Sequence, residues 1–150
     1  MNASAVTTVN GTAHDARNTG HITLRIAGGA SVVAGLVHYA AVPEHRAEWL
    51  LAALFFTIIG AFQVLWPVLV HVCRRRALWW AALAVNLGLL ALWLISRTAG
   101  LPFGPEAGDP EPVGVLDTIA SAAELITVAA LLMRPRLLPW SALPAESPAE

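Results

Sequence analysis

The chain has 150 residues, of which 57% are hydrophobic and only 13% are charged, with a mean hydropathy of +0.63. A soluble domain carries about a quarter charged residues and somewhat under half apolar ones, so this composition indicates a membrane protein. The net charge of −1 gives no basic footprint for nucleic acid, and no nucleic-acid partner is expected. The one cysteine excludes an internal disulfide and a cysteine-based zinc site.

Four apolar stretches are each long enough to cross a bilayer, which takes about 20 residues. Before them, residues 1–21 are rich in Thr, Asn and Ala and lack the layout of a signal peptide, so we expect a disordered cytoplasmic tail. We expect a second such tail over residues 135–150. The predicted spans, within a membrane domain of residues 22–134, cover residues 22–42, 49–72, 77–96 and 113–133.

Short connections between the spans predict how they pack. Pro43 ends the first span, and two of the three connections are only a few residues long, which makes successive helices antiparallel neighbours. Pro67 lies inside the second span and is tolerated there if a neighbouring helix satisfies the carbonyl that it frees. The predicted fold is therefore all-α, an up-down four-helix transmembrane bundle. Small residues favour close packing of the first span: Gly28, Gly29, Ser31, Gly35 and Ala40. Tryptophans near the span ends are typical interfacial anchors: Trp49, Trp79, Trp80 and Trp93.

The arginines predict the orientation of the bundle. Cytoplasmic loops of membrane proteins carry an excess of basic residues, and here seven of the nine arginines lie at one end of the spans, while the other end receives five acidic residues. We therefore expect both termini in the cytoplasm. The arginines at the predicted cytoplasmic end are Arg17, Arg25, Arg74, Arg75, Arg76, Arg134 and Arg136.

Several polar residues lie at depths where a bilayer disfavours them. Glu124 lies 11 residues into the last span, which at 1.5 Å per residue is roughly 16 Å deep. Asp117 and Ser121 share its helix face, and Gln63 and Asn86 also fall near mid-membrane. Such residues normally face the bundle interior and mark a site or an internal bond. Gln63 and Asn86 are predicted as possible partners of Glu124, either as a site or as hydrogen bonds that hold helices together.

A second group of candidates lies at the acidic end. If the second helix begins at Pro43, Glu44 and Glu48 stand at i and i+4, and His45 and Glu48 at i and i+3. His38 would reach the same place from the neighbouring helix. Two imidazoles and one or two carboxylates suit a divalent transition metal. The alternative is that the acidic residues only favour a first helical turn through the macrodipole.

The long connection before the last span is the third feature. Residues 96–114 contain four prolines that restrict the backbone and glycines that permit turns. We predict an ordered cap over the end of the bundle, with Phe103 packing onto it. Arg97 would pair with Asp117 or Glu111, or hold an anionic ligand.

Two motif strings, Pro-Glu-His-x-x-Glu-Trp at 43–49 and Ser-Arg-Thr-x-Gly-Leu-Pro-x-Gly-Pro at 96–105, stand out. Together with His38, Asp117 and Glu124, they resemble the pattern of a group of small uncharacterised bacterial four-helix integral membrane proteins. The resemblance covers most of residues 22–133. It implies a multi-pass protein of the bacterial cytoplasmic (inner) membrane and no particular activity.

These features leave three functions open. The first is a His/carboxylate site that faces the extracytoplasmic side and binds a transition metal through His38, Glu44, His45 and Glu48, with a ligand-binding role for Arg97, Glu111, Asp117 and Glu124. The second is a non-catalytic accessory subunit with a membrane protein partner, or a homo-oligomer, in the lipid bilayer. The third is a small intramembrane enzyme acting on a lipid or isoprenoid, with Glu124 or Asp117 as catalytic general acid.

Overall fold

The computed structural model describes residues 3–133 as backbone and the side chains from Thr19 onward. This part of the chain is all-helical, and each of its four helices contains a stretch long and apolar enough to span a membrane. The 24 residues of α2 extend for roughly 36 Å, close to the ~30 Å of a bilayer core. The predicted all-α four-helix fold is confirmed. The helices are α1 (Ala3–Glu48), α2 (Leu50–Cys73), α3 (Arg76–Thr98) and α4 (Val115–Met133).

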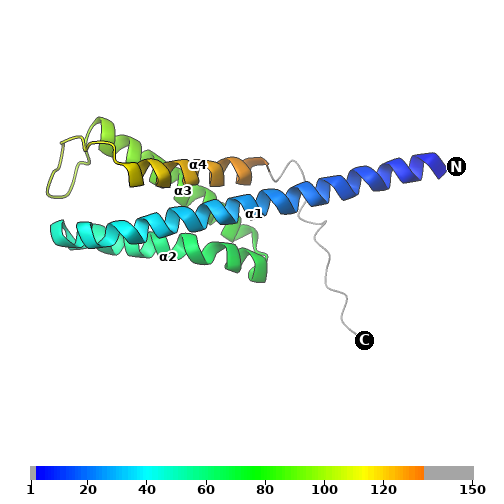
Figure 1. Ribbon diagram of the computed structural model, residues 1–150, viewed down its shortest axis with the longest axis horizontal. Coiled ribbons are helices and arrows are strands. Elements are labelled where there is room, and N and C mark those ends of the chain that lie inside the picture. The colour runs from blue at the N-terminus through cyan, green and yellow to red at the C-terminus, as the bar shows by residue number, and fades with distance from the viewer. Residues whose placement is uncertain (1–2, 134–150) are drawn as a thin grey trace.

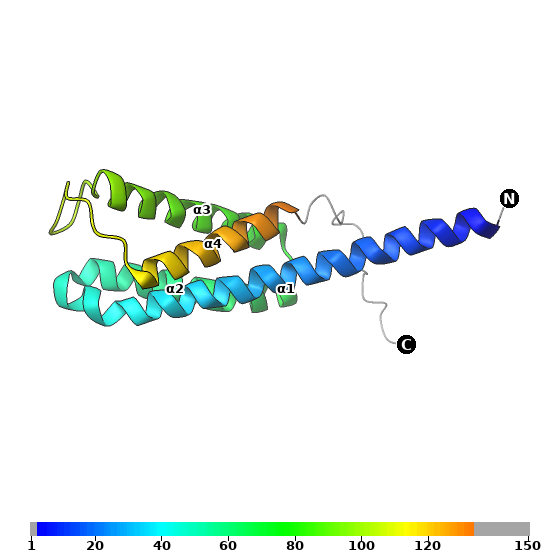
Figure 2. The same cartoon turned by 45° about the horizontal axis from the view of Figure 1, so that its top comes forward.

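Helix α1 is the central element of the bundle. It packs along α2 and along α4, whereas α3 packs mainly against α4 (Figure 1). The N-terminal part of α1 continues beyond the ends of the other three helices (Figure 2). The turns between α1 and α2 and the loop before α4 therefore lie at one end of the bundle, and the turn between α2 and α3 lies at the other.

The first helix is longer in both directions than the sequence predicts. It passes through Pro43 and ends at Glu48, with Trp49 alone separating it from α2. Pro43 lies near the end of the helix, so its missing N–H removes only one bond from the last turns, and the N–H of Trp49 still donates to the carbonyl of His45 at 2.7 Å. The predicted metal cluster therefore does not begin a second helix, because its acidic residues lie in the last turns of α1.

At its other end, α1 begins at Ala3, within the segment predicted to be a disordered tail. No proline interrupts residues 3–21, so the backbone hydrogen bonds of the span continue into this segment. The predicted tail at 135–150 lies outside the described residues.

A serine on α1 satisfies the backbone carbonyl that the proline inside α2 leaves without a partner. Pro67 has no N–H to donate to the carbonyl of Gln63, four residues earlier. The hydroxyl of Ser31, which is 1% exposed, donates to this carbonyl at 2.8 Å. The expectation that a neighbouring helix satisfies the freed carbonyl is confirmed, and the bond fixes the register of α1 against α2.

Two glycines bring α1 and α2 together at their crossing. A Cβ on Gly35 would lie 2.9 Å from the carbonyl oxygen of Gly60, and a Cβ on Gly60 would lie 3.0 Å from that of Gly35. Only glycine permits this approach, which is typical of membrane helix pairs with small residues at the interface. Gly29 of the same helix lies outside this contact, because a Cβ added to it would have no other atom within 4 Å.

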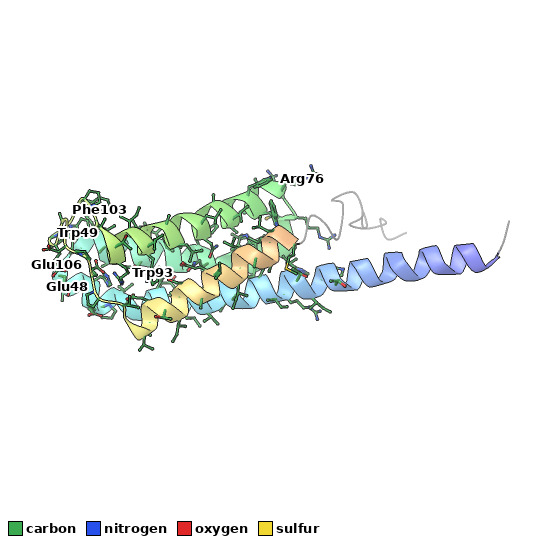
Figure 3. All side chains as sticks on the ribbon, turned by 90° about the horizontal axis from the view of Figure 1, so that it is seen from above. Glu48, Trp49, Arg76, Trp93, Phe103 and Glu106 are labelled. Carbon is green, nitrogen blue, oxygen red and sulfur yellow. The ribbon has the colours of Figure 1, made fainter. Side chains whose placement is uncertain are left out.

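The connection from α3 to α4 is an ordered cap, as predicted. The N–H of Gly108 donates to the carbonyl of Leu101 at 2.8 Å, which closes the loop on itself. The Phe103 ring packs against Trp49 with 6.3 Å between ring centroids, and both lie at the same tip of the molecule (Figure 3). The loop is thereby held over the turn that joins α1 to α2.

Candidate functional site

Four buried polar side chains, one from each helix, form a group in the interior of the bundle. Gln63 and Asn86 are 0% exposed, and Glu124 is 2% exposed. His38 completes the set at 7% exposure. We call His38, Gln63, Asn86 and Glu124 the central polar cluster. Polar groups at this depth either form a site or join helices through internal bonds.

Gln63 connects the other three members of the cluster. Its Oε1 atom lies 2.8 Å from Nδ1 of His38, and its Nε2 atom donates to Oδ1 of Asn86 at 3.3 Å and to Oε1 of Glu124 at 3.4 Å. The predicted contact of Gln63 with Glu124 is therefore confirmed. Asn86 bonds to Gln63, and its own amide donates to the carbonyl of Ala82 at 2.8 Å.

The bond to Gln63 sets the tautomer of His38. Since an amide oxygen only accepts, Nδ1 of His38 is the donor, and Nε2 of the neutral ring keeps a free lone pair. This Nε2 atom lies 3.6 Å from Oε1 of Glu124, which is longer than a hydrogen bond. The cluster thus presents a nitrogen lone pair and a carboxylate oxygen to the same point.

An apolar plug closes the cluster toward the arginine-bearing end. Trp66 and Leu131 are at most 1% exposed, and Trp79 and Leu83 are also buried. These side chains pack together as one hydrophobic group that all four helices share. Trp79 is therefore part of the core and not an interfacial anchor, while Trp80 is 60% exposed.

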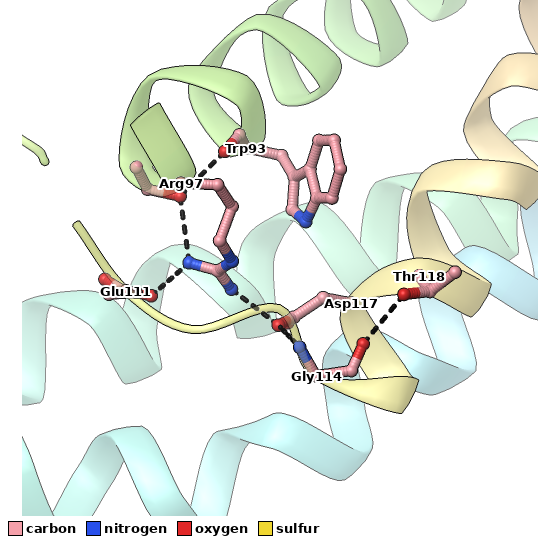
Figure 4. Close-up of polar contacts among 7 residues, drawn as sticks. Trp93, Arg97, Glu111, Gly114, Asp117 and Thr118 are labelled. Carbon is pink, nitrogen blue, oxygen red and sulfur yellow. Dashed lines mark hydrogen bonds and ion pairs between the residues drawn. The ribbon is translucent and has the colours of Figure 1, made fainter. Parts of the chain in front are cut away.

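Polar residues continue from the cluster toward the opposite end, where the loop lies. Arg97, near the end of α3, forms ion pairs with Glu111 in the loop and with Asp117 on α4 at 2.5 Å (Figure 4). Its Nη1 atom also donates to the hydroxyl of Ser96 at 3.0 Å. The guanidinium thus ties the loop and α4 to the end of α3, and the predicted pairing with Asp117 or Glu111 is confirmed for both.

Asp117 has a second role at the start of α4. Its Oδ2 atom accepts a bond from the backbone N–H of Gly114 at 3.0 Å, which is the reciprocal contact of a capping box. The backbone N–H of Glu111 donates to the carbonyl of Ser96 at 2.9 Å. Asp117 therefore caps α4 and fixes Arg97 with the same oxygen atom, so the start of α4 and the end of α3 are held together.

The four residues of the predicted metal site do not meet. Glu44 and Glu48 are exposed, and Nδ1 of His45 bonds to the carbonyl of Ala41 at 2.9 Å. The rings of His38 and His45 both pack on Phe56, with centroids 5.4 Å and 4.3 Å from it. Within the described part of the chain, no three His, Cys, Asp or Glu side chains are grouped so that they could hold a metal ion.

Two side chains have roles that the sequence patterns do not single out. Ser31 reads as one more small packing residue, yet its hydroxyl satisfies the Gln63 carbonyl. Trp93 reads as an interfacial anchor, yet its Nε1 atom is buried. The sequence does contain a signal for the role of Ser31. Proline at position 67 must leave the carbonyl at position 63 without its helical partner, so a donor on a neighbouring helix is needed.

Comparison with known proteins finds no relative of this chain. No protein-family model matches the chain, and no curated protein or solved structure matches it. The site is therefore interpreted from its own residues. Within residues 3–133, the structure has four helices that are long and apolar enough to cross a lipid bilayer.

Proposed function

We propose that this multi-pass membrane protein binds a small cation between His38 and Glu124, and that the cation enters from the loop-bearing end. The occupant is either a divalent transition-metal ion or a proton. Both are electron-pair acceptors, and both match an imidazole lone pair that faces a carboxylate. The single observation that carries the proposal is the 3.6 Å separation of His38 Nε2 and Glu124 Oε1 inside the bundle.

This separation fits a shared cation better than a direct bond. Two ligand atoms about 2.1 Å from a tetrahedral metal are about 3.4 Å apart. Gln63 supports the same interpretation, because metal-bound histidines donate their second ring N–H to an oxygen that fixes the tautomer. His38 and Glu124 would be two protein ligands, and water or the amide oxygen of Asn86 would complete the coordination. A proton shared by the pair needs only a small approach of the two side chains.

The direction of entry follows from what surrounds the pair. The apolar plug of Trp66, Trp79, Leu83 and Leu131 blocks the arginine-bearing end, whereas Asp117 and Arg97 continue the polar residues toward the loop. The positive-inside rule favours a cytoplasmic location for the arginine-bearing end. The site then opens to the extracytoplasmic side. The resemblance to small bacterial four-helix membrane proteins implies that this membrane is the bacterial cytoplasmic one.

The test compares the central pair with the outer residues that the sequence highlights. Full-length protein, purified in mild detergent after growth with added zinc, copper, nickel and manganese, is assayed for bound metal. The variants are His38→Ala and Glu124→Gln, and the matched controls are His45→Ala and Glu48→Gln. We expect near-stoichiometric metal in the wild type and in both controls, and a loss of at least tenfold in the two central variants.

Other outcomes separate the alternatives. A metal-free protein that takes up one proton between pH 5 and 8, with the uptake absent from Glu124→Gln, makes the proton the occupant. Loss of metal in the controls would move the site to the outer residues and overturn the proposal. A wild-type protein that binds no metal and takes up no proton would also overturn the proposal. That result would favour an accessory subunit in which the cluster only joins helices. A lipid-modifying activity lost in Glu124→Gln without metal would instead support an intramembrane enzyme.

A further inference from the structure

The turn between α2 and α3 carries consecutive arginines on the surface of the protein. Arg74 and Arg75, which we call the basic turn, are both exposed. They lie at the end of the bundle opposite the loop, where Figure 3 labels the neighbouring Arg76. Neither Arg74 nor Arg75 forms an ion pair with another described side chain. Their two positive charges are therefore not neutralised within this part of the chain.

The acidic residues lie too far away to balance the basic turn. Between residues 19 and 133 they lie at the loop-bearing end or in the central polar cluster, beyond the apolar plug: Glu44, Glu48, Glu106, Asp109, Glu111, Asp117 and Glu124. A further exposed arginine, Arg25, lies near the basic turn on α1, since Gly28 of that helix packs against Pro67 near the end of α2. An anion at this end is attracted by several arginines and meets no carboxylate of the described residues.

The backbone of Arg74 does not explain why an arginine occupies this position. Arg74 follows the last residue of α2 with φ 47° and ψ 29°, in the left-handed region. No other non-glycine residue in the described part of the chain has a positive φ. Glycine or asparagine usually ends a helix in this way, because a larger side chain is crowded there. The turn geometry disfavours arginine, so the charge of the side chain is the better reason for its presence.

The depth of the basic turn determines which anion it meets. Val72 on α2 and Trp80 on α3 are 70% and 60% exposed, so both side chains face lipid when the helices cross a bilayer. Exposed tryptophan is typical of the boundary between acyl chains and headgroups. Trp80 lies five residues after Arg75, which is roughly 7 Å along a helix, and each headgroup layer is about 5–7 Å thick. The basic turn therefore lies at the level of the lipid phosphates.

We propose that the basic turn binds the headgroup of an anionic phospholipid and prefers it to a zwitterionic one. A guanidinium donates two parallel N–H bonds to phosphate oxygens, and arginines beside an anionic membrane surface add to the attraction. A zwitterionic lipid has the same phosphate, but its own cationic group is repelled by the two arginines. This site goes beyond the proposed cation site, because the apolar plug separates it from His38 and Glu124.

The test measures lipid binding to the full chain by native mass spectrometry in mild detergent. The probes are phosphatidylglycerol, which is anionic, and phosphatidylcholine with the same acyl chains, which is zwitterionic. The main variant is Arg74→Gln/Arg75→Gln. The matched control is Arg46→Gln, which removes an exposed arginine at the loop-bearing end. A second variant, Arg74→Gly, removes one charge and relieves the left-handed backbone, and its stability is measured by unfolding in mixed micelles.

We expect the wild type and Arg46→Gln to bind phosphatidylglycerol about tenfold more tightly than phosphatidylcholine, and the double variant to lose most of this preference. Added sodium chloride weakens the binding of phosphatidylglycerol to the wild type, because salt screens exposed charges. Arg74→Gly is at least as stable as the wild type, since glycine adopts a positive φ freely, yet it binds phosphatidylglycerol more weakly. This combination separates a role in lipid binding from a role in the turn.

Two results would overturn the proposal directly. They are equal affinity of the wild type for the two lipids, and equal affinity of the double variant and Arg46→Gln for phosphatidylglycerol. Displacement of phosphatidylglycerol by an equal concentration of inorganic phosphate would assign the basic turn to free phosphate and would also overturn it. Bound metal, measured in the same samples, stays at the wild-type level in the double variant, so failure of the lipid site is distinguishable from failure of the cation site.

Discussion

Glu124 is a buried side chain whose presence packing alone does not explain. Glu124, at 2% exposure, meets Gln63 and His38 at distances of 3.4 and 3.6 Å. A charge at such depth in a bilayer is costly, and helices can be joined by uncharged amides at lower cost. Gln63 already does so, since it contacts three helices besides its own. Joining the helices therefore does not require the carboxyl group of Glu124, and its presence in the cluster favours a functional role.

The hydroxyl of Ser31 offers a stability test at the same scale. Ser31→Ala leaves the carbonyl of Gln63 without its partner, and we expect a loss of about 1 kcal/mol in the free energy of unfolding. Pro67→Ala returns an N–H to this carbonyl, so the same serine substitution in the Pro67→Ala background should cost about half as much or less. The measurement is unfolding by sodium dodecyl sulfate of the protein in mixed micelles.

A control for this prediction is Thr57→Ala. The Thr57 hydroxyl also donates to a backbone carbonyl, that of Ala53 at 2.7 Å, but this carbonyl belongs to an uninterrupted helix. We expect a change within about 0.5 kcal/mol. An equal cost of Ser31→Ala with and without Pro67 would show that the hydroxyl does not replace the missing backbone bond.

Among the elements, helices are readily predicted and their ends are not. The predicted second span, residues 49–72, differs by one residue at each end from Leu50–Cys73, because hydropathy defines the apolar stretch directly. Pro43 misplaces the end of the first helix, since a proline is tolerated when it removes only one bond near a terminus. The candidate metal site failed for this reason, because its geometry depended on where the helix began.

The central site could be predicted only in part. Depth along each span identifies Glu124, Gln63 and Asn86 as polar residues near mid-membrane, but depth says nothing about which helix faces meet. The sequence places His38 in the outer cluster, because it lies about one turn from the end of the predicted first span. The structure instead turns it inward to Gln63. The close crossing of α1 and α2 at Gly35 and Gly60 lies one turn away, and no pattern along one helix reveals it.

The crossing of α1 and α2 gives a prediction for these two elements. Gly35→Ala places a methyl group 2.9 Å from the carbonyl oxygen of Gly60, so the helices must separate. We expect a loss of about 1–3 kcal/mol in stability and, if His38 moves away from Gln63, a loss of bound cation. Gly29→Ala meets nothing within 4 Å and should be neutral or slightly stabilising. Equal unfolding curves for the two variants in the same micelles would contradict a tight crossing.

For the whole molecule, the two ends of the bundle differ in charge and in structure. Glu48 and Glu106 lie at one end with Trp49 and Phe103, and Arg76 lies at the other (Figure 3). The polar residues that lead from the loop to His38 stop at the apolar plug. The orientation of the bundle in the membrane therefore decides which compartment would supply the proposed cation.

This orientation can be measured with thiol labelling, because the chain has one cysteine. Cys73 is exposed at the arginine-bearing end, and Ala107 is exposed in the loop at the other end. If the arginines face the cytoplasm, a membrane-impermeant maleimide added to intact spheroplasts should label the Ala107→Cys/Cys73→Ser variant and leave the wild type unlabelled. After lysis both proteins should react. The opposite pattern would place the loop in the cytoplasm, and the His38–Glu124 pair would then take its cation from inside the cell.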